Sequence, residues 1–482
     1  MRDFVETRPG AQRALVTLSE SGQRHEHTFG SLSASSGSLA AALVEQGVGR
    51  GSVVLTLVGN RMEYVLSILA CLRIGAAALP CSEQLRPKDI ALRLARARPD
   101  LVVCDARNRP ALDAAAPDCP VLTVPDASLF AGRAAPPAVE LGPLDPAFVL
   151  FTSGTSGEPK LVTHGQRYVW GQRLQAAQWL AARPGELMWS TAAPGWSKSA
   201  RNGFIAPWLC GAVALLQDRR FDPDERLDTV RREQVAVLCM APTEYRLIAG
   251  HGPIAGAPSL RRLITAGEAL GLPAAAAWRA QTGLEIADGY GQTETGHLAG
   301  VRPGERPPPG SMGRPLPGVR VEIVDGELSV DPASVPTFFL GYDGSPAPDG
   351  WWHTGDRVRQ DEDGWLYFEA RADDVIVSAG YRIGPAEVES TLLGHAAVRE
   401  AAVIGVPDAE RGEVVAAVVV LCDGFAASDG LARELQEYVK AETAPYKYPR
   451  QVRFVDALPK TDSGKIHRAG LRAAQLQERL DQ

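Results

Sequence analysis

The sequence lacks paired cysteines and long apolar runs, and each shortage excludes a class of protein. Its seven cysteines are scattered, without a Cys-x-x-Cys pair, which fits reduced thiols and neither a disulfide framework nor a zinc site. No apolar run approaches the ~18 residues that cross a bilayer. The first residues, Met1 to Pro9, lack the apolar core of a signal peptide. We therefore expect a cytoplasmic protein with no membrane span.

Lysine is also scarce, because only seven of the 50 basic residues are lysine. In a chain whose basic residues are nearly all arginine, we expect lysine where a compact, flexible ammonium is needed. Six of the seven lie in or beside the motifs described below: Lys160, Lys198, Lys440, Lys447, Lys460 and Lys465. The net charge of -7 argues against a broad nucleic-acid surface.

One polar stretch organises the chain, Phe151-Thr-Ser-Gly-Thr-Ser-Gly-Glu-Pro-Lys160. It follows an apolar run, 147–150, that predicts a short buried strand. Two glycines, four hydroxyl side chains and one lysine offer closely spaced donors that suit phosphate oxygens. The spacing is not that of a Walker A loop, in which lysine follows the second glycine directly. The other interpretation is an ordinary surface turn.

Helix and strand patterns alternate along the first three quarters of the chain. Residues 33–46 read as a helix closed by Gly47, residues 53–58 as a strand, and residues 62–73 as a helix ending at Gly75. This alternation predicts a large, layered α/β domain with mostly parallel sheets. After Arg371-Ala-Asp-Asp374 the pattern changes to a smaller α+β unit, so we place the domains at residues 1–372 and 373–482.

Two further loops follow predicted strands, at residues 265–269 and 288–295. Ligands collect beyond the carboxyl ends of parallel strands, where such loops converge. Gly289 and Gly291, on either side of Tyr290, are expected to leave room for a flat ring. Glu294 is a candidate ligand for Mg²⁺, which prefers oxygen ligands and bridging phosphates. Each loop alone is typical of an ordinary turn.

Aromatic residues gather between residues 188 and 211, where they could line an apolar pocket. Trp189 and Trp208 suit core packing equally well, whereas Trp196 lies in a Pro-Gly-x-Ser loop and is the better pocket candidate. Near the end of the chain, Lys465 follows a Ser-Gly turn. It is either a solvated surface lysine or a mobile ammonium that one domain delivers to a phosphate held by another.

Taken together, these motifs resemble the acyl-adenylate-forming superfamily, which includes acyl-CoA synthetases, peptide-synthetase adenylation domains and luciferases. The resemblance rests on FTSGTSGEPK, AGEA, GYGQTE, TGD, RADD, AGYRIGPAEVE and PKTDSGK, in order over nearly the whole chain. Finer matches (GWSK, GEVVAAVVV and TAPYKYPR) look like the medium-chain and aromatic acyl-CoA synthetases. The resemblance implies ATP, Mg²⁺ and coenzyme A, a small mobile C-terminal domain and two half-reactions. A carboxylate first forms acyl-AMP and pyrophosphate, and a thiol then displaces AMP.

The resemblance also assigns residues to the nucleotide. The β- and γ-phosphates would lie on the polar loop, formed by Thr152, Ser153, Gly154, Thr155, Ser156, Gly157, Glu158, Pro159 and Lys160. Adenine would be enclosed by Gly267, Glu268, Ala269, Asp288, Gly289, Tyr290, Gly291 and Gln292. Thr293 would lie by the reacting carboxylate and Glu294 by Mg²⁺, while Asp356 would bind the ribose with Arg371 nearby. Lys465 would be the catalytic lysine and Asp373 the hinge.

The resemblance likewise assigns the acyl and thiol sites. The acyl pocket would include Trp196, Tyr290 and Gly291. Because acetate-type relatives have a tryptophan at the position of Gly291, we expect an acid larger than acetate. Coenzyme A would lie among Gly380, Tyr381, Arg382, Arg411, Lys440, Tyr448 and Arg450.

Three functions therefore remain open. The first is a carboxylic acid:CoA ligase for a medium-chain or aromatic acid. The second is an acyl-AMP ligase that loads the phosphopantetheine of an acyl carrier protein. The third is an inactive nucleotide-binding regulatory protein, which would have lost the charges at Lys160, Glu294, Asp356 and Lys465; the sequence keeps all four.

Overall fold

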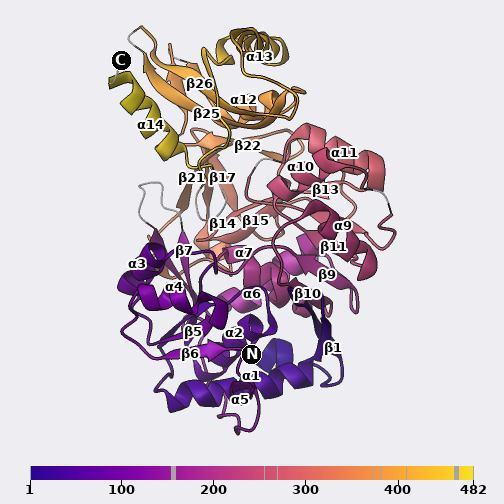
Figure 1. The fold of residues 1–482 in the computed structure, drawn as a ribbon, viewed down its shortest axis with the longest axis vertical. Coiled ribbons are helices and arrows are strands. Elements are labelled where there is room, and N and C mark those ends of the chain that lie inside the picture. The colour runs from indigo at the N-terminus through magenta and orange to yellow at the C-terminus, as the bar shows by residue number, and fades with distance from the viewer. Residues whose placement is uncertain are drawn as a thin grey trace.

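The computed structural model describes residues 2–152, 159–254, 256–268, 270–372, 374–379, 381–408, 410–460 and 466–480. These residues form two large sheets, two small antiparallel sheets and a separate C-terminal sheet. The C-terminal unit lies at one end of the elongated molecule (Figure 1). The α/β class, with a large N-terminal part rich in parallel strands and a smaller C-terminal part, is confirmed.

The first large sheet has eight strands, and its central part is parallel. Its order is β20 (Ser345–Pro346), β19 (Gly341–Tyr342), β8 (Lys160–Gly165), β7 (Pro146–Thr152), β4 (Ala77–Pro80), β3 (Val53–Leu57), β5 (Leu101–Asp105) and β6 (Val121–Val124). Its helices are α1 (Phe29–Glu45), α2 (Met62–Ile74), α3 (Pro87–Ala97), α4 (Arg109–Ala114) and α5 (Ala127–Phe130).

The second large sheet has seven strands, of which all but β2 run parallel. Its order is β13 (Ile286–Ala287), β12 (Arg262–Ile264), β11 (Val237–Cys239), β9 (Leu187–Ser190), β10 (Val213–Gln217), β1 (Arg13–Leu18) and β2 (Arg24–Thr28). The helices between its strands are α6 (Arg167–Gln175), α7 (Ser197–Ala200), α8 (Ala206–Leu209), α9 (Pro223–Arg232), α10 (Pro242–His251) and α11 (Leu272–Thr282).

Helix α2 shows how local sequence and packing agree. Nearly all of its side chains are buried, which explains its almost continuous apolar composition. It ends at Gly75, whose φ of 76° is left-handed and whose N–H bonds the carbonyl of Cys71. Glycine adopts this conformation without the steric cost that a Cβ would bring. The helix boundary expected from the sequence is thereby confirmed.

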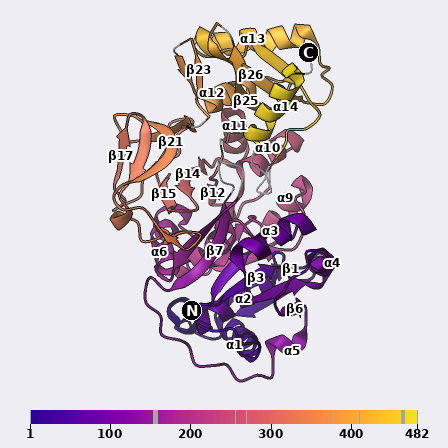
Figure 2. The ribbon, with the colours of Figure 1, turned by 90° about the vertical axis from the view of Figure 1, so that its left-hand side faces the viewer.

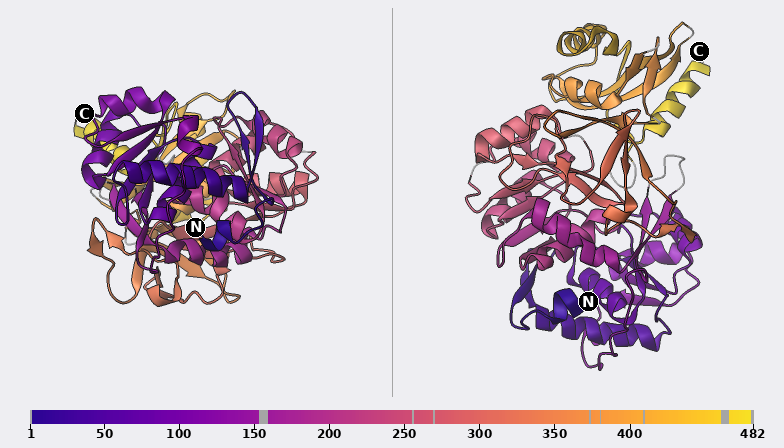
Figure 3. Two further views of the ribbon diagram at one scale, coloured as in Figure 1. Left: turned by 90° about the horizontal axis from the view of Figure 1, so that it is seen from below. Right: turned by 180° about the vertical axis from the view of Figure 1, so that it is seen from behind.

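The two small sheets connect the large ones to the C-terminal unit. One consists of β14 (Gly289–Gln292), β15 (Gly296–Gly300) and β16 (Arg314–Pro315), and the other of β17 (Val321–Val324), β18 (Glu327–Val330), β21 (Trp352–Gln360) and β22 (Leu366–Arg371). The second stands out to one side in the rotated view (Figure 2). Seen from behind, it lies between the parallel sheets and the C-terminal unit (Figure 3).

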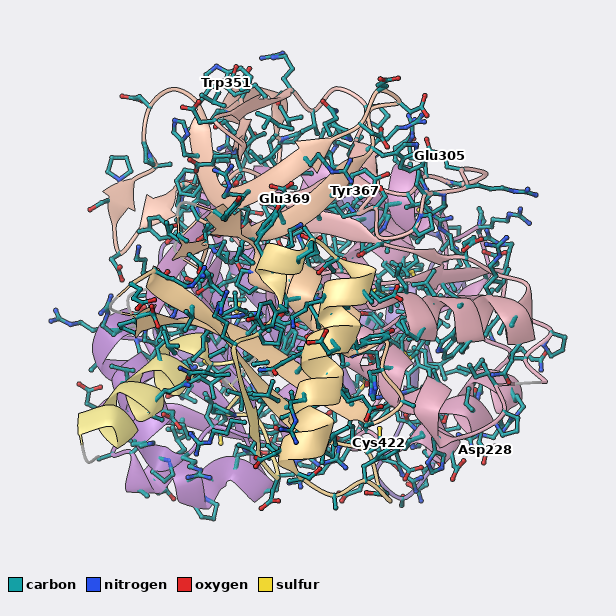
Figure 4. All side chains as sticks on the ribbon, turned by 90° about the horizontal axis from the view of Figure 1, so that it is seen from above. Asp228, Glu305, Trp351, Tyr367, Glu369 and Cys422 are labelled. Carbon is teal, nitrogen blue, oxygen red and sulfur yellow. The ribbon has the colours of Figure 1, made fainter. Side chains whose placement is uncertain are left out.

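The C-terminal sheet is formed by β24 (Tyr381–Ile383), β23 (Ile376–Ser378), β26 (Gly412–Leu421), β25 (Val398–Asp408) and β27 (Gln451–Phe454). Its helices are α12 (Pro385–Leu392), α13 (Asp429–Glu442) and α14 (Arg468–Leu480). Helix α12 contacts β22. From above, Tyr367 and Glu369 of β22 lie beside this unit (Figure 4). Among the described residues, no helix is long and apolar enough to cross a membrane.

Candidate functional site

The strand order brings the polar loops of the second large sheet to one edge. Strands β13, β12, β11 and β9 are parallel neighbours, so the residues that follow them share that edge. Those residues include Asp288, Thr265 to Glu268, Thr243 and Trp196. The sequence predicted that these loops converge, and the sheet order confirms it.

Asp356 is the best-connected carboxylate of the site and is only 4% exposed. Its Oδ2 accepts hydrogen bonds from the Tyr290 hydroxyl at 2.5 Å and from Gln292 Nε2 at 2.9 Å. The Arg371 Nη1 atom forms an ion pair with Oδ1 at 3.0 Å, because Asp356 and Arg371 are partners across β21 and β22. Beyond this ion pair, buried Oδ1 accepts no hydrogen bond. A carboxylate oxygen has more than one lone pair, so Oδ1 keeps capacity for a second donor beside Arg371.

Gln292 has its own partners at this point. Its amide nitrogen also donates to the carbonyl of Thr354 at 2.7 Å, and its oxygen accepts from Trp352 Nε1 at 3.1 Å. Burial raises the pKa of Tyr290 well above its usual range, and the neighbouring Asp356 adds to the effect. The tyrosine is therefore a fixed hydrogen-bond donor that holds the carboxylate in place.

Glu294 presents one carboxylate oxygen to the hydroxyl of Tyr342, which donates to it at 2.7 Å. Burial raises the pKa of Tyr342, and the nearby Glu294 charge raises it further. Lys160 lies 5.1 Å from the centre of the same tyrosine ring. One acid and one lysine from motifs far apart in sequence thus share a neighbour. The single carboxylate is a candidate ligand for a hard cation that also binds phosphate oxygens, and the lysine is a candidate partner for the phosphates. Among the described residues, no cluster of three or more metal-binding side chains occurs.

The adenine-side loops are held by Glu268 and Asp288. Glu268 accepts hydrogen bonds from the N–H of Thr243 at 2.9 Å and from its hydroxyl at 2.5 Å, so its carboxylate lies at the start of α10. Asp288 Oδ1 accepts from the N–H of Gly289 at 2.7 Å. Although part of its surface is open, burial raises the pKa of Asp288 to about 7.

The expected room beside Gly289 and Gly291 is filled by protein, which corrects the sequence interpretation. A Cβ on Gly291 would lie 1.9 Å from the carbonyl oxygen of Gly296, and one on Gly289 would lie 2.3 Å from the His297 ring. These glycines allow β14 and β15 to approach closely, with a bulge between Tyr290 and Gly291. The argument that Gly291 leaves an empty volume for a larger acid was therefore wrong. Whether Gly291 borders the acyl group stays a prediction.

Trp196 is half-buried, whereas Trp189 and Trp208 are 1% and 0% exposed. The core assignment of the last two is confirmed, and Trp196 remains a candidate for the acyl pocket. Lys198 lies 5.5 Å from the Trp196 ring centre and donates to the carbonyl of Ala266 at 2.5 Å. The tryptophan loop and the adenine-side loop are therefore joined directly.

Three of the candidate coenzyme A residues cluster on the C-terminal unit. Lys440 Nζ and the Arg450 guanidinium lie 4.3 Å and 4.9 Å from the ring centre of Tyr448. Tyr381 is exposed and stacks on Tyr446 with ring centres 4.3 Å apart. Arg411 lies at the turn into β26, where its carbonyl accepts from the N–H of Ala379 at 2.9 Å. Basic and aromatic groups side by side suit a phosphorylated nucleotide.

Several predicted residues lie outside the described residues: Ser153, Gly154, Thr155, Ser156, Gly157, Glu158, Ala269, Asp373, Gly380 and Lys465. The side chain of Arg382 also lies outside them. Their roles stay predictions. Their flanks are described: Thr152 and Lys160 are paired across β7 and β8, and Lys460 forms a β-bridge with Ile466.

Sequence reasoning missed a buried polar cluster beside the β14–β15 turn that carries Thr293. His164 is fully buried, and its Nε2 lies 2.8 Å from the carbonyl oxygen of Thr293. Burial lowers the pKa of His164 to about 3, so the neutral ring donates to that carbonyl. His297 is 4% exposed, and Arg201 is buried to the same degree. A histidine within a strand that also carries Leu161 and Val162, as His164 is in β8, was the available signal.

The comparisons with known proteins agree with this geometry. Residues 1–337 match the family model for AMP-binding enzymes, and residues 387–465 match that for the AMP-binding enzyme C-terminal domain. The chain is 35% identical to an uncharacterized acyl-CoA ligase, YtcI, of Bacillus subtilis, over 97% of this chain and 94% of the relative. It is 37% identical to the mitochondrial acyl-coenzyme A synthetase ACSM4 of Rattus norvegicus, over 96% of this chain and 86% of the relative.

A comparison with solved structures shows that the fold is also shared. The anthranilate CoA ligase AuaEII, in complex with anthranoyl-AMP, superposes with a TM-score of 0.89 at 27% identity, covering 98% of this chain and 96% of that one. The chain belongs to the AMP-binding, adenylate-forming enzymes, close to the medium-chain acyl-CoA synthetases. It is an AMP-forming acid:CoA ligase by class.

Proposed function

We propose that the chain joins a medium-chain or aromatic carboxylic acid to free coenzyme A in two steps on one nucleotide site. The observation that carries this proposal is the buried carboxylate of Asp356, whose Oδ1 is paired with Arg371 but accepts no further hydrogen bond. A carboxylate oxygen has more than one lone pair, so a ribose hydroxyl would donate to Oδ1 beside the arginine. Tyr290, Gln292 and Arg371 hold the carboxylate from three sides, so the acceptor is positioned before the nucleotide arrives.

In the first step, an oxygen of the substrate carboxylate attacks the α-phosphorus of ATP and the bond to pyrophosphate breaks. The polar loop from Thr152 to Lys160 would hold the departing phosphates, and Lys465 would stabilise the charge that develops on the transferred phosphate. Mg²⁺ bound by Glu294 would neutralise phosphate charge when present. In the second step, the thiolate attacks the acyl carbonyl carbon, and AMP leaves with the electron pair of the broken C–O bond.

The aromatic part of the substrate proposal is supported by the anthranilate ligase, whose fold matches this chain at a TM-score of 0.89. Half-buried Trp196 offers one flat apolar wall. The substrate is expected not to be an α-amino acid, because the loop from Gly195 to Arg201 has only basic charge. The cytoplasmic location also remains a prediction of the sequence.

The choice of free coenzyme A over a carrier protein is supported by Lys440, Tyr448 and Arg450. Their cation–aromatic cluster suits the nucleotide end of coenzyme A, which a carrier-bound phosphopantetheine lacks. Tyr448→Ala combined with Arg450→Ala should raise KM for coenzyme A by about tenfold, a loss of roughly 1.4 kcal/mol. It should leave KM for pantetheine unchanged, because pantetheine has no nucleotide to contact these residues.

The test measures pyrophosphate release and thioester formation with a panel of monocarboxylic and aromatic acids. Coenzyme A, pantetheine and a phosphopantetheinylated carrier protein serve in turn as acceptors. The proposal expects thioester on coenzyme A and the selective rise in KM described above. Thioester on the carrier alone would favour the carrier-loading ligase. Absence of pyrophosphate release with every acid would favour the inactive regulatory protein.

A further inference from the structure

Arg201 is a buried cation with unmet hydrogen-bonding capacity. It is the first residue of a short π-helix, Arg201–Ile205, that continues α7, and it is 4% exposed. Its Nε and Nη1 atoms are buried without a hydrogen-bond partner. Within the described part of the chain, no carboxylate forms an ion pair with it.

Other buried arginines in this protein have a carboxylate partner. Arg226, 6% exposed, is paired with Glu244 at 2.6 Å. Arg468 is paired with Glu389 at 2.7 Å and is largely enclosed. Removing one member of such a pair is strongly destabilising, because an uncompensated charge remains buried. Arg201 has no such partner among the described residues, so an anion bound from outside the chain would compensate its charge.

The groups around Arg201 are neutral, so none of them neutralises it. Burial lowers the pKa of both His164 and His297, and the Arg201 charge lowers each further. Burial raises the pKa of Tyr168, and both the Arg201 charge and a side-chain contact between Arg201 and the Tyr168 hydroxyl oppose that rise. The contact is not a well-aligned hydrogen bond. A second cation, Lys198, acts on His297 from the same region.

More hydrogen-bonding capacity is unmet next to this charge. Both ring nitrogens of His297 and the side-chain oxygens of Gln172 and Gln175 are buried without a partner. These three residues line a small cavity together with Thr337, Gly171 and four apolar residues, Leu174, Val319, Val335 and Pro336. Arg201 is not among the residues that line it. Each unmet buried polar group costs free energy, so the polar part of this wall would be stabilised by a polar group bound against it.

The cluster lies directly behind the expected point of reaction. The charge of Arg201 lowers the pKa of His164. The Nε2 atom of the same histidine lies within hydrogen-bond distance of the carbonyl oxygen of Thr293. His297 follows the tight β14–β15 turn, where its Cα lies 2.9 Å from the position of a Cβ on Gly291. His164 thus links Thr293, where the reacting carboxylate is expected, to the region of Arg201. The rest of the substrate could extend toward that arginine.

We propose that the substrate carries a second anionic group, and that this distal carboxylate binds Arg201. The inference deepens the proposed function, on which it rests, by defining the substrate class as a dicarboxylic acid. The distal carboxylate accepts hydrogen bonds from the unpartnered guanidinium nitrogens, with the neutral ring of His297 as a further donor. Arg201 is thus a specificity residue and takes no part in bond making.

The first experiment compares acids of matched length: adipate with hexanoate, suberate with octanoate, and terephthalate with benzoate. Initial rates of pyrophosphate release give kcat/KM for each acid. The wild type should prefer the diacid of at least one pair by roughly 10⁴-fold, the discrimination expected of a site built to hydrogen-bond a polar group. Arg201→Met should reverse that preference, and Arg201→Lys should restore part of it. If Arg201→Met lowers kcat/KM equally for both members of every pair, the arginine serves the reacting carboxylate and the proposal is overturned.

A second experiment needs no turnover. Without ligand, Arg201→Met should raise the melting temperature, because it removes an unpaired buried charge, whereas Arg226→Met should lower it by stranding Glu244. The favoured diacid should raise the melting temperature of the wild type and have a smaller effect on Arg201→Met. A fall in the melting temperature of Arg201→Met similar to that of Arg226→Met would make Arg201 structural and refute the proposal. A diacid-dependent rise without pyrophosphate release from any acid would support the anion site while the ligase proposal failed.

Discussion

The Tyr290 hydroxyl donates a 2.5 Å hydrogen bond to Asp356 Oδ2, although the two residues are 66 positions apart. Tyr290 belongs to β14 and Asp356 to β21, so this contact joins the two small antiparallel sheets. It fixes the carboxylate whose second oxygen is paired with Arg371 at 3.0 Å. The position of the proposed nucleotide site thus depends on how the small sheets pack.

Asp356→Asn should weaken ATP binding. The amide keeps the size of the side chain but loses the charge that pairs with Arg371 and accepts the ribose hydroxyl. A hydrogen bond to a charged group contributes about 1.5–3 kcal/mol, so KM for ATP should rise by roughly 10- to 100-fold. Asp361→Asn is the matched control, because Asp361 also accepts from a tyrosine, Tyr367, at 2.8 Å but lies in the β21–β22 hairpin. Equal effects of both changes would argue against a nucleotide role.

Lys465→Ala should slow adenylation by about 10²–10³, as for removal of one donor to a developing charge. The same variant should still form thioester from supplied acyl-AMP and coenzyme A. Gly380→Leu should do the opposite, because its side chain would fill the expected path of the thiol. The two half-reactions are measured separately by pyrophosphate exchange and by thioester formation.

Lys460→Ala is the control for the lysine, since Lys460 Nζ is already paired with Glu400 at 2.6 Å on the same C-terminal unit. It should leave adenylation within about twofold of the wild type, as for most exposed ion pairs. If Lys465→Ala slowed both half-reactions equally, the hypothesis that the C-terminal unit uses different faces for the two steps would be wrong.

Gly291→Ala should destabilise the protein, because the space expected beside this glycine is filled by protein. The new Cβ would lie 1.9 Å from the Gly296 carbonyl oxygen, and such overpacking costs about 1–3 kcal/mol. Gly250→Ala is the control, because a Cβ there meets nothing within 4 Å and the residue is helical. That control should stabilise by about 0.5–1 kcal/mol. Thermal unfolding compares the two, and an unchanged melting temperature for Gly291→Ala would contradict the close packing.

His164 should make the protein less stable in acid. Burial lowers its pKa from 6.5 to about 3 in the folded state, so between these values the unfolded chain binds a proton that the folded chain does not. Its contribution to stability is complete above pH 6.5 and is lost as the pH falls below it, at up to about 1.4 kcal/mol per pH unit.

Melting temperatures at pH 7 and pH 5.5 test this dependence. The wild type should lose more stability on acidification than His164→Gln, whereas His251→Gln, which removes a surface histidine, should behave as the wild type. His297 adds a dependence of the same sign, because burial also lowers its pKa. A His164→Gln slope as steep as that of the wild type would show that His164 is not the group responsible.

The sequence predicted most elements of the fold because local signals and packing agree there. The helix ending at Gly75 and the strand at residues 53–58 both appear, as α2 and as β3 at Val53–Leu57. A glycine after a helix and a continuous apolar run are local signals, so they predict helix ends and buried strands without knowledge of distant residues. The convergence of the strand-end loops was also predictable, since parallel strands place their carboxyl ends together.

By itself, the sequence determined the class of protein, the order of its motifs and the charged residues the chemistry needs, because these are properties of the chain in one dimension. Only the tertiary structure decided what each side chain faces. It showed that Gly291 makes room for the backbone of Gly296, since the packing of β14 on β15 cannot be read from glycine content. It also showed Arg201 buried without a carboxylate partner among the described residues. An arginine in a loop-and-helix sequence gives no sign of its burial, because burial depends on segments that are distant along the chain, such as those of His164 and His297.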